Sequence, residues 1–489
     1  MLDKISVLKS IRIKNKNKVI GLCHGVFDIL HSGHIDHFNE AKKHVDVLVV
    51  SLTVDKYVNK GPRQPLNNHH NRALLLKNLK MVDHVILSHN ASCMEIIKKL
   101  KPNIYFKGKD YKTLDKFNNL QKEKNVLKKN GGVFKLTKTK LQSSTKKFNS
   151  IYNWAPDQRD IIKKVSDLNK NKQIERALKY ISNLEINIVG ETIIDSYENC
   201  EIMGVTTKDP TISVLKNTKI EAGGGALAAA LMASEFAKKV NLFTYGSNVK
   251  LKKFLKKKNI YLINLNKNKP LQEKRRYINQ TRGEKLIQVT NFKKNSFNKK
   301  DYVYMSKEFL KFKKHNTIIF DYGLGLFEDI FLKLFNKLHN KTYLNVQTNS
   351  VNLGFNLFNK FSKFKYISLD KREWILGTKS KEIDINKIRK LIKKNCFASI
   401  TLGDMGAKII DKKNIYQCPT LVKSVKDTTG SGDSYHIITS LMSMSKILDP
   451  LIVVFLGNLY AGMHGQNLGN TNIITKKKFV ENILSIINV

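Results

Sequence analysis

The sequence predicts a two-part α/β protein built on parallel sheets. Short apolar runs alternate with amphipathic stretches along the 489 residues, a pattern typical of βαβ units. A polar, helix-prone segment at about 148–182 separates two such blocks, and each block contains a glycine-bearing turn that leads into a helix. A chain of this length is expected to form about two to four domains, since one domain typically has roughly 100–200 residues.

The first block begins with an apolar strand at 19–22, followed by a turn and a helix over about 34–44. Further strands are predicted at 45–52, 84–87 and 103–106, a helix starts near 72–78, and the block closes near residue 147. The second block opens with a strand at 186–189 and has later apolar runs at 317–320, 343–346, 366–369 and 398–402. These runs end close to Gly, Asp or Asn, so we expect ligands beyond the carboxyl ends of the strands.

Composition excludes several classes of protein. Hydrophobic residues make up 41% and charged residues 26%, which argues against a wholly disordered chain. No run approaches the roughly 20 apolar residues of a membrane helix, and the charged N-terminus has no apolar signal core. The five cysteines are scattered and form no CxxC pair, which favours reduced thiols over a zinc ribbon or a disulfide framework. We therefore expect a soluble, cytoplasmic protein with no membrane partner.

The net charge of +47 has two interpretations. A basic surface can bind nucleic acid because it releases counterions from phosphate. Alternatively, an AT-rich genome enriches Lys, Asn and Ile through their codons and leaves a solvated basic surface. Asn is abundant wherever Lys is, and the chain contains no zinc finger, RGG-like tract or basic region leading into heptads. The second interpretation is favoured, and no nucleic-acid partner is expected.

The densest group of chemical residues is HGVFDILHSGH at 24–34, directly after a predicted strand and at the start of a helix. His31 and His34 lie three residues apart, with a glycine before the second. A helix N-terminus there offers free N–H groups and the positive end of the dipole, which suits the phosphates of a nucleotide. The imidazoles can donate hydrogen bonds to oxygens that gain charge as pyrophosphate leaves. Core histidines or a metal pair are the alternatives, and the flanking Gly and Asp argue against them.

This stretch resembles the nucleotidyltransferase superfamily marked by HxGH, in its cytidylyltransferase-like branch. The similarity covers about 18–147 and includes the GxFDxLHxGH-like segment 25–34, Asp55 after the second strand, GPRQP at 61–65, KGKDY at 107–111 and SSTK at 143–146. It implies a Rossmann-like domain that uses a divalent ion and either ATP or CTP. The implied catalytic residues are His31, His34 and Lys107; the implied nucleotide-binding residues are Gly25, Phe27, Asp28, Arg63, Asp110, Ser144 and Thr145; Asp55 is implied to bind substrate.

A second motif, DTTGSGD at 427–433, precedes a helix-like segment near the C-terminus. Small residues before a helix leave backbone N–H groups pointing at a phosphate, and Asp433 can take the proton from an attacking hydroxyl. An Asp cap on a glycine-rich turn is the structural alternative. The full seven-residue string favours the catalytic interpretation.

This motif resembles the DTxGxGD signature of ribokinase-like (PfkB-type) carbohydrate kinases, over about residue 185 to the end. GETIID at 190–195, AGGGA at 222–226, KRRY at 274–277, DYG at 321–323 and TLG at 401–403 agree in order. The resemblance implies a ribokinase-like α/β sandwich with a small β lid, which uses ATP and Mg²⁺. It implies Asp433 as the base; Thr401, Gly403, Gly406, Gly430, Ser431, Gly432 and Asn458 at the nucleotide; Asp195, Gly224, Gly225 and Arg276 at the sugar; and Asp370 and Glu373 at the metal.

Two positions depart from the kinase pattern. The family's GGAxNVA carries an Asn that contacts the sugar, whereas this chain has Leu227 and Ala228 in that segment. The Asn of the family's NxxE is Asp370 here. These changes leave the identity of the sugar open, and they leave open a weakly active kinase half.

Together the two halves are similar to bifunctional heptose-phosphate kinase/heptose 1-phosphate adenylyltransferase enzymes of surface-polysaccharide synthesis, with the order of the halves reversed. We expect a nucleotidyltransferase domain at 1–147, a helical linker at 148–184 and a carbohydrate kinase domain at 185–489. Sugars, sugar phosphates and nucleoside triphosphates are the implied partners, and a homodimer is possible for such enzymes. Two alternatives stay open: a polyol-phosphate cytidylyltransferase whose kinase-like half only regulates, and a basic protein associated with nucleic acid.

Overall fold

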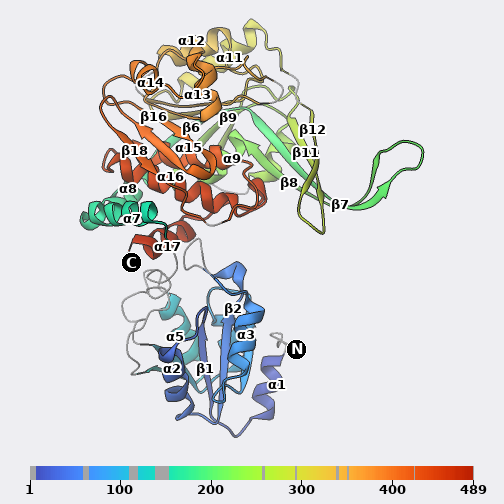
Figure 1. Cartoon of the computed structure of the whole chain (residues 1–489), viewed down its shortest axis with the longest axis vertical. Helices are drawn as coiled ribbons and strands as arrows, with labels where there is room; N and C mark the ends of the chain where they lie inside the picture. The colour runs from blue at the N-terminus through green and yellow to red at the C-terminus, as the bar shows by residue number, and fades with distance from the viewer. Residues whose placement is uncertain are drawn as a thin grey trace. The chain divides into compact units, whose positions relative to one another are not determined.

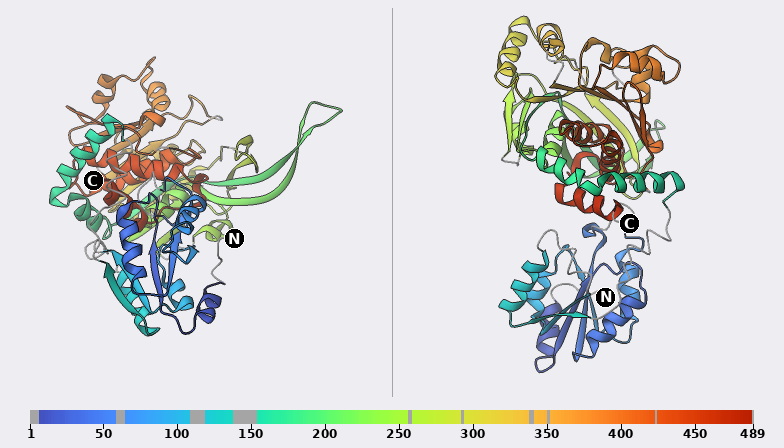
Figure 2. Two further views of the ribbon diagram at one scale, coloured as in Figure 1. Left: turned by 60° about the horizontal axis from the view of Figure 1, so that its bottom comes forward. Right: turned by 90° about the vertical axis from the view of Figure 1, so that its left-hand side faces the viewer.

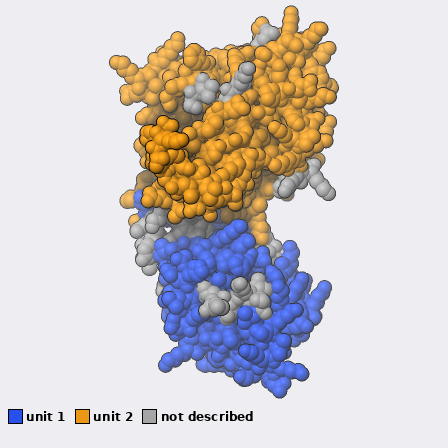
Figure 3. Space-filling model, turned by 90° about the vertical axis from the view of Figure 1, so that its right-hand side faces the viewer, with its two compact units in different colours: residues 1–155, 481–489 blue, residues 156–480 orange. Residues whose placement is uncertain are grey.

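The computed structural model describes residues 7–58, 65–108, 119–137, 154–255, 259–291, 294–337, 341–349, 352–422 and 424–487. The chain divides into two compact units, which Figure 3 colours separately: residues 1–155 with 481–489, and residues 156–480. Both units are α/β with mainly parallel sheets, which confirms the predicted fold class.

The first unit, whose strands β1 and β2 are labelled in Figure 1, is a doubly wound sheet of five parallel strands in the order β3-β2-β1-β4-β5. The strands are β1 Ile20–Gly25, β2 Val47–Thr53, β3 His84–Ser88, β4 Ile104–Gly108 and β5 Val133–Thr137. The helices are α1 Val7–Lys14, α2 Ser32–Lys42, α3 His69–Lys77, α4 Met94–Leu100 and α5 Asn119–Lys129, with a 3₁₀ turn, η1, at Asp55–Tyr57. The strand order reverses beside β1, so the carboxyl ends of β1 and β4 form the switch point where ligands bind in such sheets.

Each face of this sheet has its own apolar core. Helices α1, α4 and α5 cover one face through side chains such as Ile11, Ile97 and Leu127. Helices α2 and α3 cover the other face through Phe38 and Leu76, among others. Because both faces are buried, the central strands read as continuous apolar runs, and this explains why the sequence predicted them.

The second unit is built on a sheet of nine strands in the order β10-β9-β6-β13-β14-β15-β16-β17-β18. The strands are β6 Glu185–Gly190, β9 Lys239–Thr244, β10 Ile260–Asn264, β13 Asn316–Asp321, β14 Thr342–Val346, β15 Tyr366–Asp370, β16 Phe397–Thr401, β17 Ala407–Ile410 and β18 Ile415–Cys418. The first seven strands in spatial order are parallel, β17 is antiparallel to β16, and β18 is antiparallel to β17.

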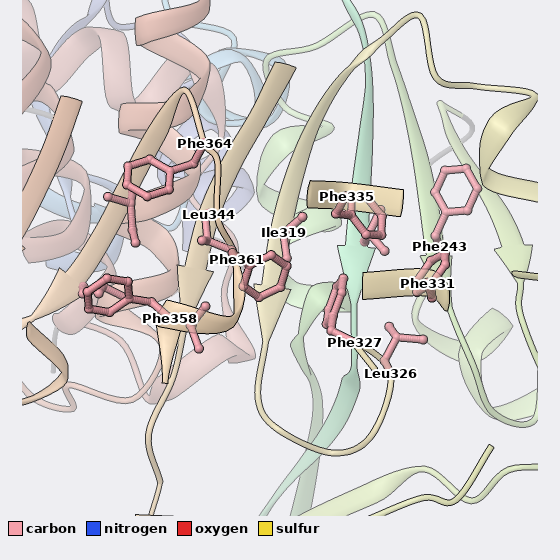
Figure 4. Close-up of a cluster of buried hydrophobic side chains, with 14 of the residues drawn as sticks. Phe243, Ile319, Leu326, Phe327, Phe331, Phe335, Leu344, Phe358, Phe361 and Phe364 are labelled. Atoms are coloured by element: carbon pink, nitrogen blue, oxygen red, sulfur yellow. The ribbon is translucent and has the colours of Figure 1, made fainter. Parts of the chain in front are cut away.

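Helices cover both faces of the nine-stranded sheet. One face packs against α11 Lys299–Leu310, α12 Asp329–Lys337, α13 Lys371–Thr378 and α14 Ile385–Leu391 through an aromatic-rich core, part of which Figure 4 shows. The other helices are α7 Pro156–Leu168, α8 Gln173–Ile181, α9 Ala226–Ala233, α10 Asn248–Phe254, α15 Ser431–Met444, α16 Pro450–Gly465 and α17 Lys476–Ile487. Among them, α9 and α15 are almost wholly buried and lie against the central strands. Short 3₁₀ turns occur at η3 Asn169–Asn171, η5 Phe358–Lys360, η6 Gly403–Met405 and η7 Gly469–Thr471.

A separate four-stranded sheet, here called the lid sheet, has the order β12-β11-β7-β8. Its strands are β7 Thr192–Val205, β8 Ile212–Gly225, β11 Gln272–Asn279 and β12 Lys285–Asn291. The distal half of the β7–β8 hairpin extends away from the body of the unit, as both Figure 1 and Figure 2 show. The described structure thus contains the small β lid that the kinase resemblance implied.

The segment predicted as a linker forms two ordered helices where it is described. Helix α7 begins at Pro156, a residue suited to a helix start because it has no N–H to leave unpaired, and α8 ends at Ile181. Both helices belong to the second unit. The boundaries of the proposed domains at 147 and 184 stay predictions.

All five cysteines are unpaired thiols, and all five are buried. Burial raises the pKa of the Cys418 thiol to about 12, so this group stays protonated at neutral pH. The chain therefore has no disulfide, as its scattered cysteines indicated. Among the described residues, no helix is both long and apolar enough to cross a membrane.

Two candidate active sites

The first candidate site lies at the carboxyl ends of β1, β2 and β4. Strand β1 ends at Gly25, a loop follows, and α2 begins at Ser32 with His31 as its N-cap residue. The rings of His31 and His34 stack with 3.9 Å between their centroids. The structure thus brings the two predicted imidazoles together at the positive end of a helix dipole, where an anionic ligand is stabilised.

Phe27 packs against His34 of this histidine pair. It is buried, has a positive φ of 49°, and its ring meets the edge of His34 at a centroid distance of 5.4 Å. A second contact joins it to Phe38 of α2 in the core. Phe27 was predicted to bind nucleotide, and the structure places its ring in the core, in contact with His34.

Asp28 ties the histidine loop to the segment that follows β2. Its two carboxylate oxygens accept hydrogen bonds from the backbone N–H groups of Leu66 (2.7 Å) and Asn67 (2.9 Å). Asp55, the predicted substrate residue, is held by the guanidinium of Arg72 and by the His69 ring at 2.8 Å. Burial alone would raise the pKa of Asp55, but the hydrogen bonds from His69 and Arg72 outweigh it and lower the pKa.

Lys107 is a buried cation at the end of β4. Its ammonium donates to the carbonyl oxygen of His24 at 3.0 Å and lies 5.5 Å from the centre of the Tyr105 ring. Burial, with a further contribution from Lys107, lowers the pKa of both His24 and His37 to about 4. These two histidines are therefore neutral at pH 7. The predicted residues Arg63, Asp110, Ser144 and Thr145 lie outside the described residues.

The second candidate site is a cavity between the nine-stranded sheet, the lid sheet and the start of α15. Its lining includes these predicted residues: Asp195, Gly225, Arg276, Asp370, Glu373, Thr401, Gly430, Gly432 and Asp433. Predicted residues that are not part of this lining are Gly224, Gly403, Gly406, Ser431 and Asn458. Asn458 instead donates hydrogen bonds to the carbonyls of Cys418 and Pro419 at the end of β18.

Asp433 is the third residue of α15 and is almost fully buried. Its Oδ1 accepts a hydrogen bond from the side-chain amide of Gln347, which follows β14. Burial raises the pKa of Asp433 to about 6, and interactions with Tyr322 and Lys274 limit the rise. A carboxylate that is ionised at pH 7 but can still accept a proton has the property required of a general base.

The turn before α15 is shaped for an anion. Gly430 has a positive φ of 78°, and a Cβ there would lie 2.6 Å from Asn470 Oδ1. A side chain at position 430 is thereby excluded, and Gly430 and Gly432 line the cavity at the N-terminus of α15. A phosphoryl group at this point would lie next to Asp433.

The lid sheet contributes charged residues to the same cavity. Asp195 of β7 pairs with Arg276 of β11 at 2.7 Å, and Asn470 donates to its other oxygen at 3.1 Å. A Cβ at Gly224 would lie 2.3 Å from Asp195 Oδ2, so glycine is required for the carboxylate to take this position. Lys274, also on β11, adds a second cation to the lining.

Asp370 and Glu373 form a capping box at the start of α13. Each carboxylate accepts the backbone N–H of the other residue, and Glu373 also accepts the N–H of Thr348 at 3.0 Å. In the part of the chain that the structure describes, no group of three or more His, Cys, Asp or Glu residues could hold a metal ion. Two carboxylates nevertheless suit Mg²⁺, which usually keeps several waters and binds through one or two carboxylates plus substrate phosphates.

Sequence reasoning missed several lining residues. Gln347, which follows β14, and Asn470 of η7 reach the cavity, and neither belongs to a motif with a fixed local spacing. Lys274 of β11 also lines the cavity, although it was recognised only as part of the KRRY segment and was assigned no role. Arg72 is fully buried in the first site, where it donates hydrogen bonds to Asp55 and to the carbonyl of Val26. The sequence indicated only its place at the start of a helix.

Comparisons with known proteins agree with the division of the chain into two units. Residues 22–152 match a family model described as cytidylyltransferase-like. The bifunctional protein HldE of Aliarcobacter butzleri is 39% identical over 106 residues, which is 21% of this chain and 22% of that protein. HldE of Helicobacter hepaticus is 41% identical over 98 residues, 20% of each chain. The chain thus spans about a fifth of the length of the curated relatives that it matches.

The crystal structure of Escherichia coli phosphofructokinase-2 in complex with substrates and products matches with a TM-score of 0.50 and 12% identity, over 62% of this chain and 99% of that chain. At this identity the likeness shows the fold. The chain therefore joins a Rossmann-like unit similar to the cytidylyltransferase-like family to a second unit with the ribokinase-like fold of phosphofructokinase-2.

Proposed function

We propose that the chain is a bifunctional transferase that phosphorylates a sugar and couples a sugar phosphate to a nucleotide. The product would be a nucleotide-activated, heptose-like sugar for surface-polysaccharide synthesis. The observation that carries the kinase half is that Asp433 and the glycine turn before α15 line one cavity with Asp195. The stacked His31–His34 pair beside Lys107 at a sheet switch point supports the transferase half.

In the kinase site, the sugar would lie toward Asp195, Arg276 and Lys274, and the ATP γ-phosphate toward Gly430 and Gly432. Asp433 would accept the proton of the attacking hydroxyl, and the N–H groups of α15 would stabilise the charge on the transferring group. Asp370 and Glu373 would hold Mg²⁺, which supplies charge neutralisation at the phosphates.

In the transferase site, no covalent enzyme intermediate is needed. The residues must align the incoming phosphate opposite pyrophosphate and stabilise the charge that develops. We assign His31, His34 and Lys107 to the reacting phosphate, Gly25 and Asp28 to the nucleotide-side loop, and Asp55 to the substrate side. The nucleotide is ATP or CTP. Arg63, Asp110, Ser144 and Thr145 retain their assignment to nucleotide binding by resemblance alone.

The test uses one variant in each unit. Asp433→Asn should abolish ATP-dependent sugar phosphorylation and leave nucleotidyl transfer near normal, and His34→Ala should do the reverse. Products formed from a panel of sugars and sugar phosphates with each nucleoside triphosphate are identified by mass spectrometry. Loss of both activities in either variant would contradict two independent sites.

A second candidate is a cytidylyltransferase for a polyol phosphate, with a second unit that binds a ligand and regulates. The observation in its favour is that Leu227, at the position of the family's sugar-contacting segment, is fully buried and does not line the cavity. CTP-dependent coupling of glycerol phosphate or another polyol phosphate, together with no phosphorylation of any sugar in the panel, would favour this candidate.

We propose that the protein is a cytoplasmic homodimer that pairs through the distal β7–β8 hairpin. Val205 and Ile212 lie directly opposite each other near its tip and are 63% and 59% exposed. A two-stranded ribbon that exposes such side chains gains stability by burying them against a second copy about a two-fold axis. Replacing both residues by Lys should convert a dimer into a monomer in light scattering, and a wild-type monomer would contradict the proposal.

We propose that the protein has no nucleic-acid partner, although its net charge is +47. Binding to nucleic acid should be weak and lost at physiological salt, because it would rest on counterion release alone. Tight binding at about 150 mM salt in a filter assay would overturn this part of the proposal.

A further inference from the structure

Lys285 joins the lid sheet to the turn that precedes α15. It is the first residue of β12, and its ammonium lies 2.6 Å from Asp427 Oδ1 and 3.0 Å from Thr429 Oγ1. The two partners belong to a segment more than 140 residues further along the chain, directly before Gly430. The contact therefore connects the sheet that carries Asp195 with the turn that we assign to the transferring phosphate.

Asp427 shapes this turn from within. Its Oδ1 also accepts the backbone N–H of Thr429 at 2.9 Å and the Thr429 hydroxyl at 2.8 Å, while its side chain is only 1% exposed. Its second oxygen, Oδ2, is buried and has no hydrogen-bond partner within the described ranges. The carboxylate is thus fixed in place with much of its charge uncompensated by backbone donors.

A buried negative charge at this position opposes phosphate binding. The turn leads directly into the N-terminus of α15, where Gly430 and Gly432 line the cavity. Two like charges a few ångströms apart in a poorly solvated site repel each other strongly, and the helix dipole offsets only part of that repulsion. Among the described residues, Lys285 is the basic side chain that forms an ion pair with Asp427.

We propose that Lys285 is a positioning residue of the kinase site, which neutralises Asp427 and so allows the turn at 427–430 to accept a phosphoryl group. The inference rests on the kinase half of the proposed function. Its consequence is that the lid sheet controls the charge of the phosphate site, because Lys285, Asp195 and Arg276 belong to the same sheet. Sugar contacts on β7 and β11 and phosphate affinity at α15 are thereby coupled.

A double-mutant cycle tests the proposal. Lys285→Met, Asp427→Asn and the double variant are compared for sugar phosphorylation and for calorimetric binding of a non-hydrolysable ATP analogue with Mg²⁺. Asn at 427 keeps the side-chain oxygen that accepts from Thr429 and removes the charge. Lys219→Met is the matched control, since Lys219 lies in the same sheet, is 35% exposed and pairs with Glu221, whose side chain is 27% exposed.

Lys285→Met alone should lower kcat/KM for ATP by about 10- to 100-fold, as expected for loss of one electrostatic partner at a phosphate site. The double variant should return to within about threefold of Asp427→Asn, because no buried charge is then left unpaired. Lys219→Met should behave as wild type. Thermal unfolding of each variant separates these effects from loss of folding.

Additive losses in the double variant would overturn the proposal, because they would mean that Lys285 acts on the phosphate directly. Unchanged ATP-analogue affinity in Lys285→Met would overturn it as well. If the wild-type protein phosphorylates no sugar, the kinase assignment fails, while the binding cycle with the ATP analogue still decides whether Lys285 neutralises Asp427.

Discussion

Arg276 and Asp195 form a buried ion pair between neighbouring strands of the lid sheet, with 2.7 Å between Nη1 and Oδ1. Their side chains are 4% and 5% exposed. Arg276 also donates to Gln288 of β12, so its guanidinium links three strands of the sheet beside the cavity.

Arg276→Met should destabilise the second unit, since it leaves a buried carboxylate with Asn470 as its remaining donor. The expected loss is about 3 kcal/mol in the free energy of unfolding, measured with urea. Adding Asp195→Asn should recover part of this loss, because the buried charge is then gone. Equal stability of wild type and Arg276→Met would show that the pair contributes nothing.

Arg72→Met should disable the first unit selectively. Its fully buried guanidinium donates to the carbonyls of Val26, Thr53 and Asn67 and to Asp55, so it joins the histidine loop to the end of β2. Nucleotidyl transfer should fall by at least about 100-fold, as is typical when groups around the reacting atoms are misplaced.

Sugar phosphorylation by the Arg72→Met variant should be unchanged, and this is measured in the same preparation. Leu74→Gln, a change at an exposed position of the same helix, is the control. A variant that keeps normal nucleotidyl transfer would contradict the organising role of Arg72.

The pH profile of sugar phosphorylation should reflect Asp433. Its pKa of about 6 means that the carboxylate loses its capacity as a base when pH falls below that value. We expect kcat/KM to drop about tenfold for each pH unit below 6. Gln347→Leu removes a hydrogen bond that favours the ionised carboxylate, so its acidic limb should move to higher pH. Identical profiles would argue against contact between the two residues during catalysis.

The stability of the second unit should depend on pH through Glu191. Its carboxylate accepts backbone N–H groups of Tyr322, Leu324 and Leu326, and burial together with the Asp321 charge raises its pKa from 4.5 to about 7. Between these two values the folded state holds a proton that the unfolded state releases. The contribution of Glu191 to the free energy of unfolding is therefore greatest below pH 4.5 and is lost as pH rises through 7, by up to about 3 kcal/mol.

Glu191→Gln should remove the contribution of Glu191 to the pH dependence of the free energy of unfolding. Urea unfolding at pH 5 and pH 8 measures it as the difference between wild type and variant. The same change in unfolding free energy in both proteins would mean that Glu191 titrates normally.

The sequence predicted those parts of the protein that depend on local patterns. The two glycine turns, at Gly25 and Gly430, were found because strand, turn and helix follow one another within a few residues. The parallel strands were found because burial on both faces makes them continuous apolar runs.

Contacts between distant segments could not be predicted in this way. The parallel pairing of β11 with β7 brings Arg276 to Asp195 across 81 residues, and Gln347 reaches Asp433 across 86. No periodicity or spacing records such contacts, since they depend on how the sheets pack. For the same reason, the contact between Lys285 and Asp427 could not be predicted, although Asp427 was recognised as the first residue of the DTTGSGD motif.

Because all five thiols are buried, the native chain should react only slowly with cysteine-directed reagents. A single cysteine introduced on the exposed hairpin, for example at Met203, would then be the main reactive group, without removal of the native five. A fluorophore or spin label attached there would report on the surroundings of the hairpin in an otherwise unmodified protein.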